Sequence, residues 1–203
     1  MQIDRAKLRA TVARYYEEPI ARALIWARIG PNAVTLIGLA LAGVTAYLIA
    51  IDWLLWGGLM LIVSGGLDSI DGAVARMSGK ASSAGALLDS VVDRAAEGVV
   101  LFGVLWLAVE SDDGTLALLT FVALLGSLLV SYVVARATAL GSPRAVGLMT
   151  RPERVVALAV GLVTGFLTIA VAVIAVLATV TAVHRLWYGL STLRAGADET
   201  PGA

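Results

Sequence analysis

The sequence lacks cysteine, has a single histidine and carries few charges for its length. Without cysteine there can be no disulfide, thiol nucleophile or cysteine-ligated metal site. Charged residues make up 15% of the 203 residues and hydrophobic residues 59%, whereas a soluble globular domain carries about 25% charged residues. His184, beside Arg185 at the end of an apolar run, is interpreted as an interfacial residue and not as a catalyst. The composition therefore favours an integral membrane protein.

Long apolar stretches predict six membrane-spanning helices. A span needs about 20 mostly apolar residues, and the candidates lie at 33–51, 53–67, 86–109, 114–135 and in the two halves of 155–183. The second candidate continues helically into an aspartate-rich stretch. The last stretch has 29 residues, too many for one upright span of about 30 Å. Gly161 or Gly165 offers the turn that would divide it.

Basic residues are missing from alternate loops of this arrangement. The loops on one side contain Asp52, Glu110, Asp112 and Asp113 but no Lys or Arg, and all fifteen Lys and Arg fall on the other side. The positive-inside rule makes the basic side cytoplasmic. We therefore expect an all-α integral membrane protein of the cell membrane, with six spans in a domain at 31–190. Both termini would be cytoplasmic, the chain would end in a short polar tail at 191–203, and no nucleic-acid partner is expected.

The N-terminal segment 1–30 is predicted to be helical and to lie against the cytoplasmic membrane surface. Ile3, Leu8, Val12 and one of two tyrosines, Tyr15 or Tyr16, could share an apolar face, with Arg and Glu opposite. Pro19 would begin a second short helix. A solvated basic helix is the alternative interpretation.

Four aspartates interrupt this apolar chain near the second and third spans. Asp68 and Asp71 are three residues apart, and Asp89 and Asp93 are four apart, so each pair shares one helical face. A short loop of small residues lies between the pairs and would bring the two faces together as an antiparallel hairpin. We expect the hairpin to open at the cytoplasmic side.

Facing carboxylates at membrane depth need compensation, because each buried charge is unfavourable and like charges repel. Oxygen-only ligands suit Mg²⁺, Mn²⁺ or Ca²⁺. Four carboxylates suffice for two metal ions that clamp a diphosphate. The alternative is a set of aspartates at helix ends that reach water or pair with Arg76 and Arg94.

The spacing of these residues resembles the signature of the CDP-alcohol phosphotransferase (CDP-alcohol phosphatidyltransferase) family. Eight fixed positions within 26 residues carry the resemblance: Asp68-x2-Asp71-Gly72-x2-Ala75-Arg76-x8-Gly85-x3-Asp89-x3-Asp93. Members of this family are six-helix membrane enzymes of phospholipid biosynthesis, usually homodimers, with an N-terminal helix on the cytoplasmic surface. The resemblance therefore implies a homodimer in addition to the six helices.

The resemblance also implies a reaction, in which a hydroxyl of an acceptor alcohol attacks the lipid-side phosphate of a CDP-linked lipid and CMP leaves. Two Mg²⁺ ions, or Mn²⁺ in their place, would hold the diphosphate. By analogy the metal ligands are Asp68, Asp71, Asp89 and Asp93, and Asp93 is also the general base. The expected contacts to the nucleotide and the CDP-linked lipid are Asn32, Thr35, Gly72, Arg76 and Ser82. Asn32 could also act as a helix N-cap.

The acceptor is indicated by arginines about sixty residues downstream. The stretch "SYVVARATALGSPRAVGLMTRPERVV" resembles synthases that make phosphatidylinositol phosphate and their archaeal counterparts, which act on archaeol lipids. In that branch the phosphate of inositol 1-phosphate would be bound by Arg136, Arg151, Arg154 and Arg185. Arginines bind phosphate well because the guanidinium group can donate two parallel hydrogen bonds. Val134 departs from the branch, where a basic residue is common at that position.

Several alternatives remain open at this point. A phosphatidylglycerophosphate synthase would use glycerol 3-phosphate, another phosphate ester, and the arginines would also satisfy the positive-inside rule and bind anionic lipids. A cation-binding transporter is the alternative of another class, because intramembrane carboxylates also mark ion paths. Glu97 could orient Asp93 or an arginine, or could pair with Arg94, and Glu153 is expected to hold arginines in place.

Overall fold

The computed structural model describes residues 13–143, 145, 147 and 149–198, and within them the fold is entirely helical. A short π-helix, η1 (Ala13–Glu17), leads into α2 (Glu18–Trp26). The helices that follow are α3 (Pro31–Ala50), α4 (Leu54–Met77), α5 (Ser83–Glu110), α6 (Gly114–Ala139), α7 (Arg151–Thr164) and α8 (Leu167–Asp198). The all-helical prediction is thus confirmed.

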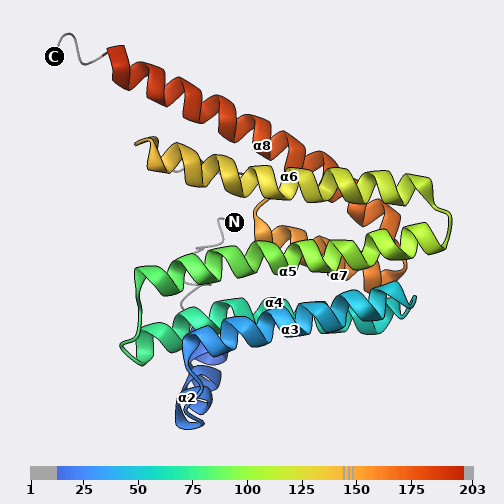
Figure 1. Cartoon of the computed structure of the whole chain (residues 1–203), viewed down its shortest axis with the longest axis horizontal. Helices are drawn as coiled ribbons and strands as arrows, with labels where there is room; N and C mark the ends of the chain where they lie inside the picture. The colour runs from blue at the N-terminus through green and yellow to red at the C-terminus, as the bar shows by residue number, and fades with distance from the viewer. Residues whose placement is uncertain (1–12, 144, 146, 148, 199–203) are drawn as a thin grey trace, which may run out of the picture.

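The helices form a bundle in which sequence neighbours run antiparallel (Figure 1). Helices α4 and α5 both pack on α3, and α6 packs along α8. Helix α7 lies between α4 and α8, and α2 packs against α4 and projects from the end of the bundle. The first turn of α7 therefore lies beside the C-terminal half of α4, where Arg151 contacts Asp68.

Sharp turns divide the apolar helices at one end of the bundle. Asp52, Asp112 and Gly165 have left-handed backbone conformations, with φ of 62°, 53° and 78°, as is common just past a helix C-terminus. The predicted division of stretch 155–183 therefore occurs at Gly165. Gly161 lies inside α7, where an added Cβ would come within 2.3 Å of the Ala170 Cβ, so this glycine permits close packing of α7 on α8.

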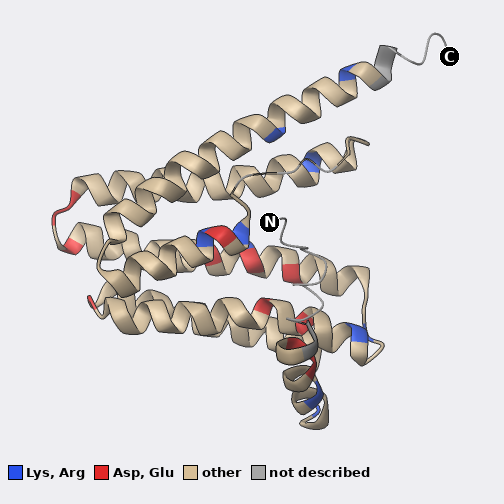
Figure 2. Cartoon of the chain, turned by 180° about the vertical axis from the view of Figure 1, so that it is seen from behind, with Lys and Arg blue, Asp and Glu red and all other residues tan. Residues whose placement is uncertain are grey.

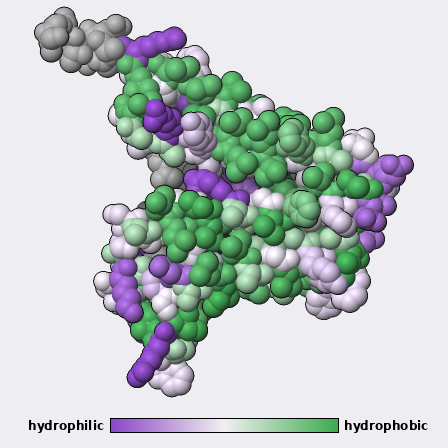
Figure 3. All heavy atoms as spheres, viewed as in Figure 1, coloured by the Kyte–Doolittle hydropathy of each residue, from purple (hydrophilic) through white to green (hydrophobic). Residues whose placement is uncertain are grey.

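The outer surface is suited to a lipid environment. Many large hydrophobic side chains are exposed, and they cover much of the middle of the bundle (Figure 3). Within the described residues, four helices are long and apolar enough to cross a membrane: Pro31–Ala50, Leu54–Met77, Gly114–Ala139 and Leu167–Ala195. Helix α5 carries several charges in its first half, and α7 has only 14 residues. Together these helices make a multi-pass membrane protein.

The acidic turns lie at one end of the bundle, away from the basic residues (Figure 2). Asp52 lies between α3 and α4, and Asp112 and Asp113 lie between α5 and α6. Lys and Arg residues occupy the α4–α5 turn, the start of α7 and the far ends of α6 and α8 (Figure 2). The charge separation read from the sequence is therefore present in the fold.

Small residues let the helix backbones approach closely. A Cβ on Gly103 of α5 would lie 2.5 Å from the carbonyl oxygen of Ala46 on α3. No side chain larger than hydrogen fits there without separating the two helices. Helix α3 is thus held tightly against α5 at this point.

The two ends of the chain meet the predictions only in part. Residues Ile3, Leu8 and Val12, on which the amphipathic face depends, lie outside the described residues. The second short helix begins at Glu18, with Pro19 in its first turn, as predicted. At the other end α8 continues to Asp198, so much of the expected polar tail extends the last helix.

Candidate active site

The α4–α5 hairpin brings the two aspartate pairs together in the half that contains its turn. Gly79, with φ of +67°, turns the chain after α4. Ser82 is the N-cap of α5, and its hydroxyl accepts a hydrogen bond of 3.1 Å from the Gly85 N–H. Both features let α5 start beside the end of α4. Asp68, Asp71, Asp89 and Asp93 are then close enough for each carboxylate to interact electrostatically with at least two of the others.

Arg151, the first residue of α7, bridges two of the carboxylates from the other side. Its Nη1 lies 2.7 Å from Oδ1 of Asp93, and the same nitrogen donates to Oδ2 of Asp68. Its Nε is buried and has no hydrogen-bond partner among the described residues. The guanidinium group therefore balances charge on this side of the cluster and keeps one donor that a ligand could use.

Asp71 is held by a neutral partner. The hydroxyl of Thr35 on α3 donates to Oδ2 of Asp71 at 2.7 Å, and it lies 3.1 Å from the carbonyl oxygen of Pro31. Both side chains are almost fully buried. Within the described residues neither Asp71 nor Asp89 forms an ion pair with Lys or Arg. Thr35 therefore fixes the orientation of Asp71 without neutralising it.

A cavity of about 210 Å³ lies on the side of the cluster that faces α3. It contains all five of the residues predicted to contact the nucleotide and the CDP-linked lipid, and it is lined by Asn32, Thr35, Gly72, Arg76, Lys80, Ser82, Gly85, Asp71 and Asp89, among others. The structure thus brings the predicted nucleotide residues together with one aspartate from each helix. Asn32 does not cap α3, because the N-cap is Gly30 and makes no side-chain hydrogen bond.

Two glycines shape this cavity. A Cβ on Gly85 would lie 3.2 Å from the Ser82 hydroxyl and 3.6 Å from Oδ1 of Asn32. A Cβ on Gly72 would lie 3.2 Å from Nη1 of Arg76. The absence of both side chains leaves the polar groups around the cavity accessible to a ligand.

Three residues near the aspartate cluster were not predicted as part of the site. Lys80 lines the cavity that faces α3, and Glu17 of η1 forms an ion pair of 3.6 Å with Arg76. On α4, two residues before Asp68, a Cβ on Gly66 would lie 2.5 Å from the hydroxyl oxygen of Tyr16. The N-terminal segment therefore packs directly on α4 next to the site. The contacts of Tyr16 and Glu17 join residues 50 and 59 positions apart, so local sequence patterns could not reveal them.

A second cavity, of about 530 Å³, lies between α4 and α7. Its polar part contains Asp68, Asp93 and Arg151, and the rest of its wall is mostly small or apolar, formed by Ile62, Gly65, Gly66, Pro152, Val155, Val156 and Ala159, together with Ser69. Ile62 and Val156 are also exposed on the outer surface. This cavity therefore joins the carboxylates to the surface that faces lipid.

The four arginines predicted to bind the acceptor phosphate do not converge. Arg151 lies at the aspartates, whereas Arg136 lines an apolar crevice between α6 and α8. Arg185 is buried beneath Gly147 and donates from Nη1 to the carbonyl oxygen of Val130 at 3.2 Å. Arg154 is 2% exposed and faces Glu97. The structure thus brings only Arg151 into the acidic site.

The donor chemistry of the cluster fits hard divalent cations. All of its candidate ligands are carboxylate oxygens, which Mg²⁺ and Mn²⁺ prefer. Among the residues that the structure describes, however, no three acidic or histidine side chains are oriented around one point so as to hold a metal ion. The contacts of Arg151 with Asp68 and Asp93 explain part of this, because these oxygens face the guanidinium group.

Comparison with known proteins decides the family. The sequence profile described as CDP-alcohol phosphatidyltransferase matches residues 28–188. The chain belongs to this family. The matched segment includes both cavities, all four aspartates and Arg151. The family resemblance read from the aspartate spacing is therefore confirmed.

Named relatives of this CDP-alcohol phosphatidyltransferase form a consistent group. A phosphatidylinositol phosphate synthase of Corynebacterium glutamicum is 37% identical over 153 residues, which are 74% of this chain and 70% of that protein. An archaetidylinositol phosphate synthase of Pyrococcus horikoshii is 32% identical over 192 residues, which are 94% and 99% of the two chains.

Solved structures agree with the sequence relatives. A crystal structure of Mycobacterium tuberculosis phosphatidylinositol phosphate synthase with CDP-DAG bound has a TM-score of 0.79 and 31% identity, covering 88% of this chain and 93% of that one. The same enzyme with manganese and citrate has a TM-score of 0.80 and 30% identity, covering 86% and 88%. This CDP-alcohol phosphatidyltransferase is thus a membrane transferase of phospholipid biosynthesis, similar to phosphatidylinositol phosphate synthases.

Proposed function

We propose that this protein transfers a phosphatidyl or archaetidyl group from a CDP-linked lipid to a hydroxyl of inositol 1-phosphate and releases CMP. The observation that carries the proposal is the position of the aspartate cluster between two different cavities. One cavity is lined by the residues predicted to contact the nucleotide, and the other combines Arg151 with an apolar wall. The named relatives, which make inositol phosphate lipids, support this choice of acceptor.

The nucleotide end of the CDP-linked lipid would occupy the cavity beside α3. Asn32 and Ser82 offer polar side chains to the cytidine, and Thr35 contributes by orienting Asp71. Arg76 would exchange its exposed ion pair with Glu17 for the diphosphate. Gly72 leaves room for the diphosphate to approach the backbone of α4.

The lipid chains would follow the second cavity toward the membrane. Its apolar wall between α4 and α7 continues from Asp68 and Asp93 to residues exposed on the outer surface. A diphosphate at the carboxylates could therefore have its nucleotide on one side and its lipid on the other. This arrangement places the lipid-side phosphorus near Asp93 and Arg151.

Asp68, Asp71, Asp89 and Asp93 would hold two divalent cations, Mg²⁺ or Mn²⁺. The ions would neutralise the diphosphate and acidify the acceptor hydroxyl. Asp93 then takes the proton of that hydroxyl. The hydroxyl oxygen forms a bond to the lipid-side phosphorus, and the bond from this phosphorus to the bridging oxygen breaks. The bridging oxygen leaves with CMP, so atoms and charges balance.

Arg151 would bind the phosphate group of the acceptor. It is the arginine that the fold brings to Asp93, and its buried Nε has no hydrogen-bond partner among the described residues. Arg136 and Arg185 remain predicted ligands of the acceptor phosphate. They would have to reach it from the side of α6 and α8. Glycerol 3-phosphate is the second candidate acceptor, because it presents the same phosphate chemistry to Arg151.

We also propose six spans with both termini in the cytoplasm of the cell. Helix α5 has 28 residues, about 42 Å of helix, and two of its charged residues, Asp93 and Glu97, pair with arginines of α7. Helix α7 has 14 residues and is therefore about 21 Å long, which is shorter than the apolar core of a membrane. It would cross the membrane with its first turn in the interfacial region. The expected domain at 31–190 would thus contain all six spans. The homodimer implied by the family resemblance can be tested by cross-linking.

The proposal is tested by CMP release from CDP-diacylglycerol and CDP-archaeol by the purified protein with Mg²⁺. The acceptors to compare are inositol 1-phosphate, glycerol 3-phosphate, free inositol and serine. We expect saturable CMP release with inositol 1-phosphate and no release when the divalent cation is chelated. Release with glycerol 3-phosphate alone would make glycerol 3-phosphate, and not inositol 1-phosphate, the acceptor. Release with none of the four acceptors would overturn the proposed function.

A further inference from the structure

The short N-terminal helix η1 places a carboxylate at the edge of the cavity beside α3. Oε2 of Glu17 lies 3.6 Å from Nη2 of Arg76 on α4, and 15% of the Glu17 side chain is exposed. The other terminal nitrogen of Arg76 lies over Gly72, because a Cβ on this glycine would come within 3.2 Å of Nη1. The Arg76 side chain therefore runs back along α4, and Glu17 contacts the guanidinium group that lines this cavity.

Contacts with the bundle on both sides of Glu17 fix its position. On its C-terminal side, Ala21 of α2 is fully buried in an apolar cluster with residues of α3 and α4. On its N-terminal side, a Cβ on Gly66 would lie 2.5 Å from the hydroxyl oxygen of Tyr16, so Tyr16 packs against the backbone of α4. The carboxylate of Glu17 is thus tethered beside Arg76 at a high effective concentration.

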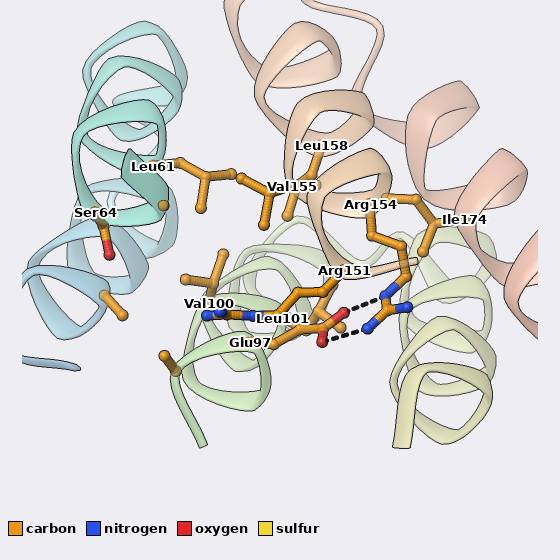
Figure 4. A pocket seen from close by; sticks show the side chains of 13 residues that line it. Leu61, Ser64, Glu97, Val100, Leu101, Arg151, Arg154, Val155, Leu158 and Ile174 are labelled. Carbon is orange, nitrogen blue, oxygen red and sulfur yellow. Dashed lines mark hydrogen bonds and ion pairs between the residues drawn. The ribbon is translucent and has the colours of Figure 1, made fainter. Parts of the chain in front are cut away.

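This ion pair differs from the buried pair between α5 and α7. There Arg154, and not Arg94, donates to both carboxylate oxygens of Glu97, at 2.6 and 2.8 Å, beside a small, mostly apolar cavity (Figure 4). Those side chains are 2% and 12% exposed, so separating them would leave a buried charge unpaired. The Arg76 side chain is 67% exposed and has a single contact with Glu17. Because water screens such a pair and its stabilisation is small, an anionic ligand can replace Glu17.

A diphosphate in this cavity would compete with Glu17 for the same guanidinium group. Arg76 and Gly72 both line the cavity proposed for the nucleotide. A diphosphate carries more negative charge than a carboxylate and offers several oxygens to a guanidinium group. With the carboxylate still in place, the two anions would repel each other. Occupation of Arg76 by the one therefore opposes occupation by the other.

We infer that Glu17 is a tethered competitor of the nucleotide. It occupies Arg76 while the cavity is empty, is displaced when the diphosphate of the CDP-linked lipid binds, and returns to Arg76 as CMP leaves. The identity of the nucleotide rests on the proposed function. The lipid substrate is also held by its lipid chains, whereas CMP has none, so a lower affinity for the nucleotide mainly speeds release of the product.

The first test measures the Kd of CDP and of CMP by calorimetry with Mg²⁺, for the native protein and for Glu17→Gln. This variant keeps the shape of the side chain and removes its charge. We expect both Kd values to fall about two- to fivefold, the factor that corresponds to the stabilisation of an exposed ion pair. An unchanged Kd would overturn the inference. A higher Kd would overturn it too, because Glu17 would then help Arg76 to bind the nucleotide.

The neighbouring residue supplies a matched control. Glu18 forms its ion pair with Arg22, at 3.4 Å, and both side chains are exposed. Glu18→Gln therefore makes the same change of charge one residue away and leaves the contact with Arg76 intact. It should leave both Kd values unchanged. If Glu18→Gln tightened CDP binding as much as Glu17→Gln, the effect would come from the general charge of the segment, and the inference would be wrong.

A double variant shows whether Glu17 acts through Arg76. In the Arg76→Gln background, adding Glu17→Gln should change the Kd for CDP less than about 1.5-fold, since the group for which the two anions compete is already absent. A tightening as large as in the native background would mean that Glu17 repels the nucleotide without contacting Arg76, and would contradict the inference.

The binding measurements and the acceptor assay can fail separately. A native protein that binds CDP but releases CMP with none of the four acceptors would contradict the proposed function and leave the role of Glu17 standing. A native protein that releases CMP from CDP-diacylglycerol, while Glu17→Gln binds CDP no more tightly, would overturn the role of Glu17 alone. A native protein that does not bind CDP would overturn both.

Discussion

The two sides of the aspartate cluster differ in what holds their carboxylates. On the side of α3, Asp71 accepts a hydrogen bond from the neutral Thr35 hydroxyl, and its cavity is lined by the residues proposed to bind the nucleotide. On the side of α7, Asp68 and Asp93 share the guanidinium group of Arg151. A neutral donor orients a carboxylate but leaves its charge for a cation. A guanidinium group balances the charge and can also bind an anion. The two sides are therefore suited to different ligand groups.

The largest effect is expected from Asp93→Asn, which removes the proposed base at the point where the two sides meet. CMP release should fall at least about 100-fold, the usual contribution of a general base. The matched control is Asp112→Asn at the opposite end of the bundle, where Asn tolerates the left-handed backbone of Asp112. Near-normal CMP release by Asp93→Asn would remove this residue from the mechanism.

Arg151→Gln should affect the α7 side alone. The KM for inositol 1-phosphate should rise about 10- to 100-fold, because a hydrogen bond to a charged group contributes about 1.5–3 kcal/mol. The KM for CDP-diacylglycerol should stay within about threefold. Arg194→Gln, on the exposed end of α8, is the control. An equal rise in both KM values would mean that the two sides are not separate.

Much of the site could be predicted from local patterns. The spacings of three and four residues predict the two aspartate pairs, and the length of an apolar stretch predicts a turn at Gly161 or Gly165, which the structure has at Gly165. Contacts across the fold could not be obtained in this way. Arg151 and Asp68 are 83 positions apart, and Arg154 and Glu97 are 57 apart, so their pairing depends on how α7 packs.

The arginine cluster shows the same limit most clearly. Its members lie near one another in the sequence, or at one end of the predicted spans, and a common ligand was the simplest expectation. In the fold Arg154 turns toward α5, and Arg185 lies under Gly147. Sequence position established that these residues share a membrane side, but only side-chain packing determines which of them faces the aspartates.

Arg76→Gln should give a smaller effect, confined to the α3 side. Arg76 is largely exposed in its ion pair with Glu17, so water screens its interactions. We expect the KM for CDP-diacylglycerol to rise about three- to tenfold and the KM for inositol 1-phosphate to stay unchanged. Steady-state kinetics with each substrate varied in turn checks this. A rise confined to the acceptor KM would reverse the assignment of the two sides.

Gly85→Ala should give the smallest effect. Its new Cβ would lie 3.2 Å from the Ser82 hydroxyl and 3.6 Å from Asn32 Oδ1, and the hydroxyl can move slightly to make room. We expect a rise of about two- to threefold in the KM for CDP-diacylglycerol. Gly43→Ala, whose Cβ would meet nothing within 4 Å, is the control. Equal kinetics for the two alanine variants would place the nucleotide away from Gly85.

The claim that the nucleotide and the acceptor phosphate bind on two sides of one aspartate cluster is tested most directly by equilibrium binding of CDP, the head group of the lipid substrate. Its affinity for the purified protein would be measured by calorimetry with saturating Mg²⁺, with and without saturating inositol 1-phosphate. If the two ligands occupy different sides, the Kd for CDP should change less than about threefold, since no site is shared. A Kd that rises in proportion to the inositol 1-phosphate concentration would show competition for one site and contradict this account.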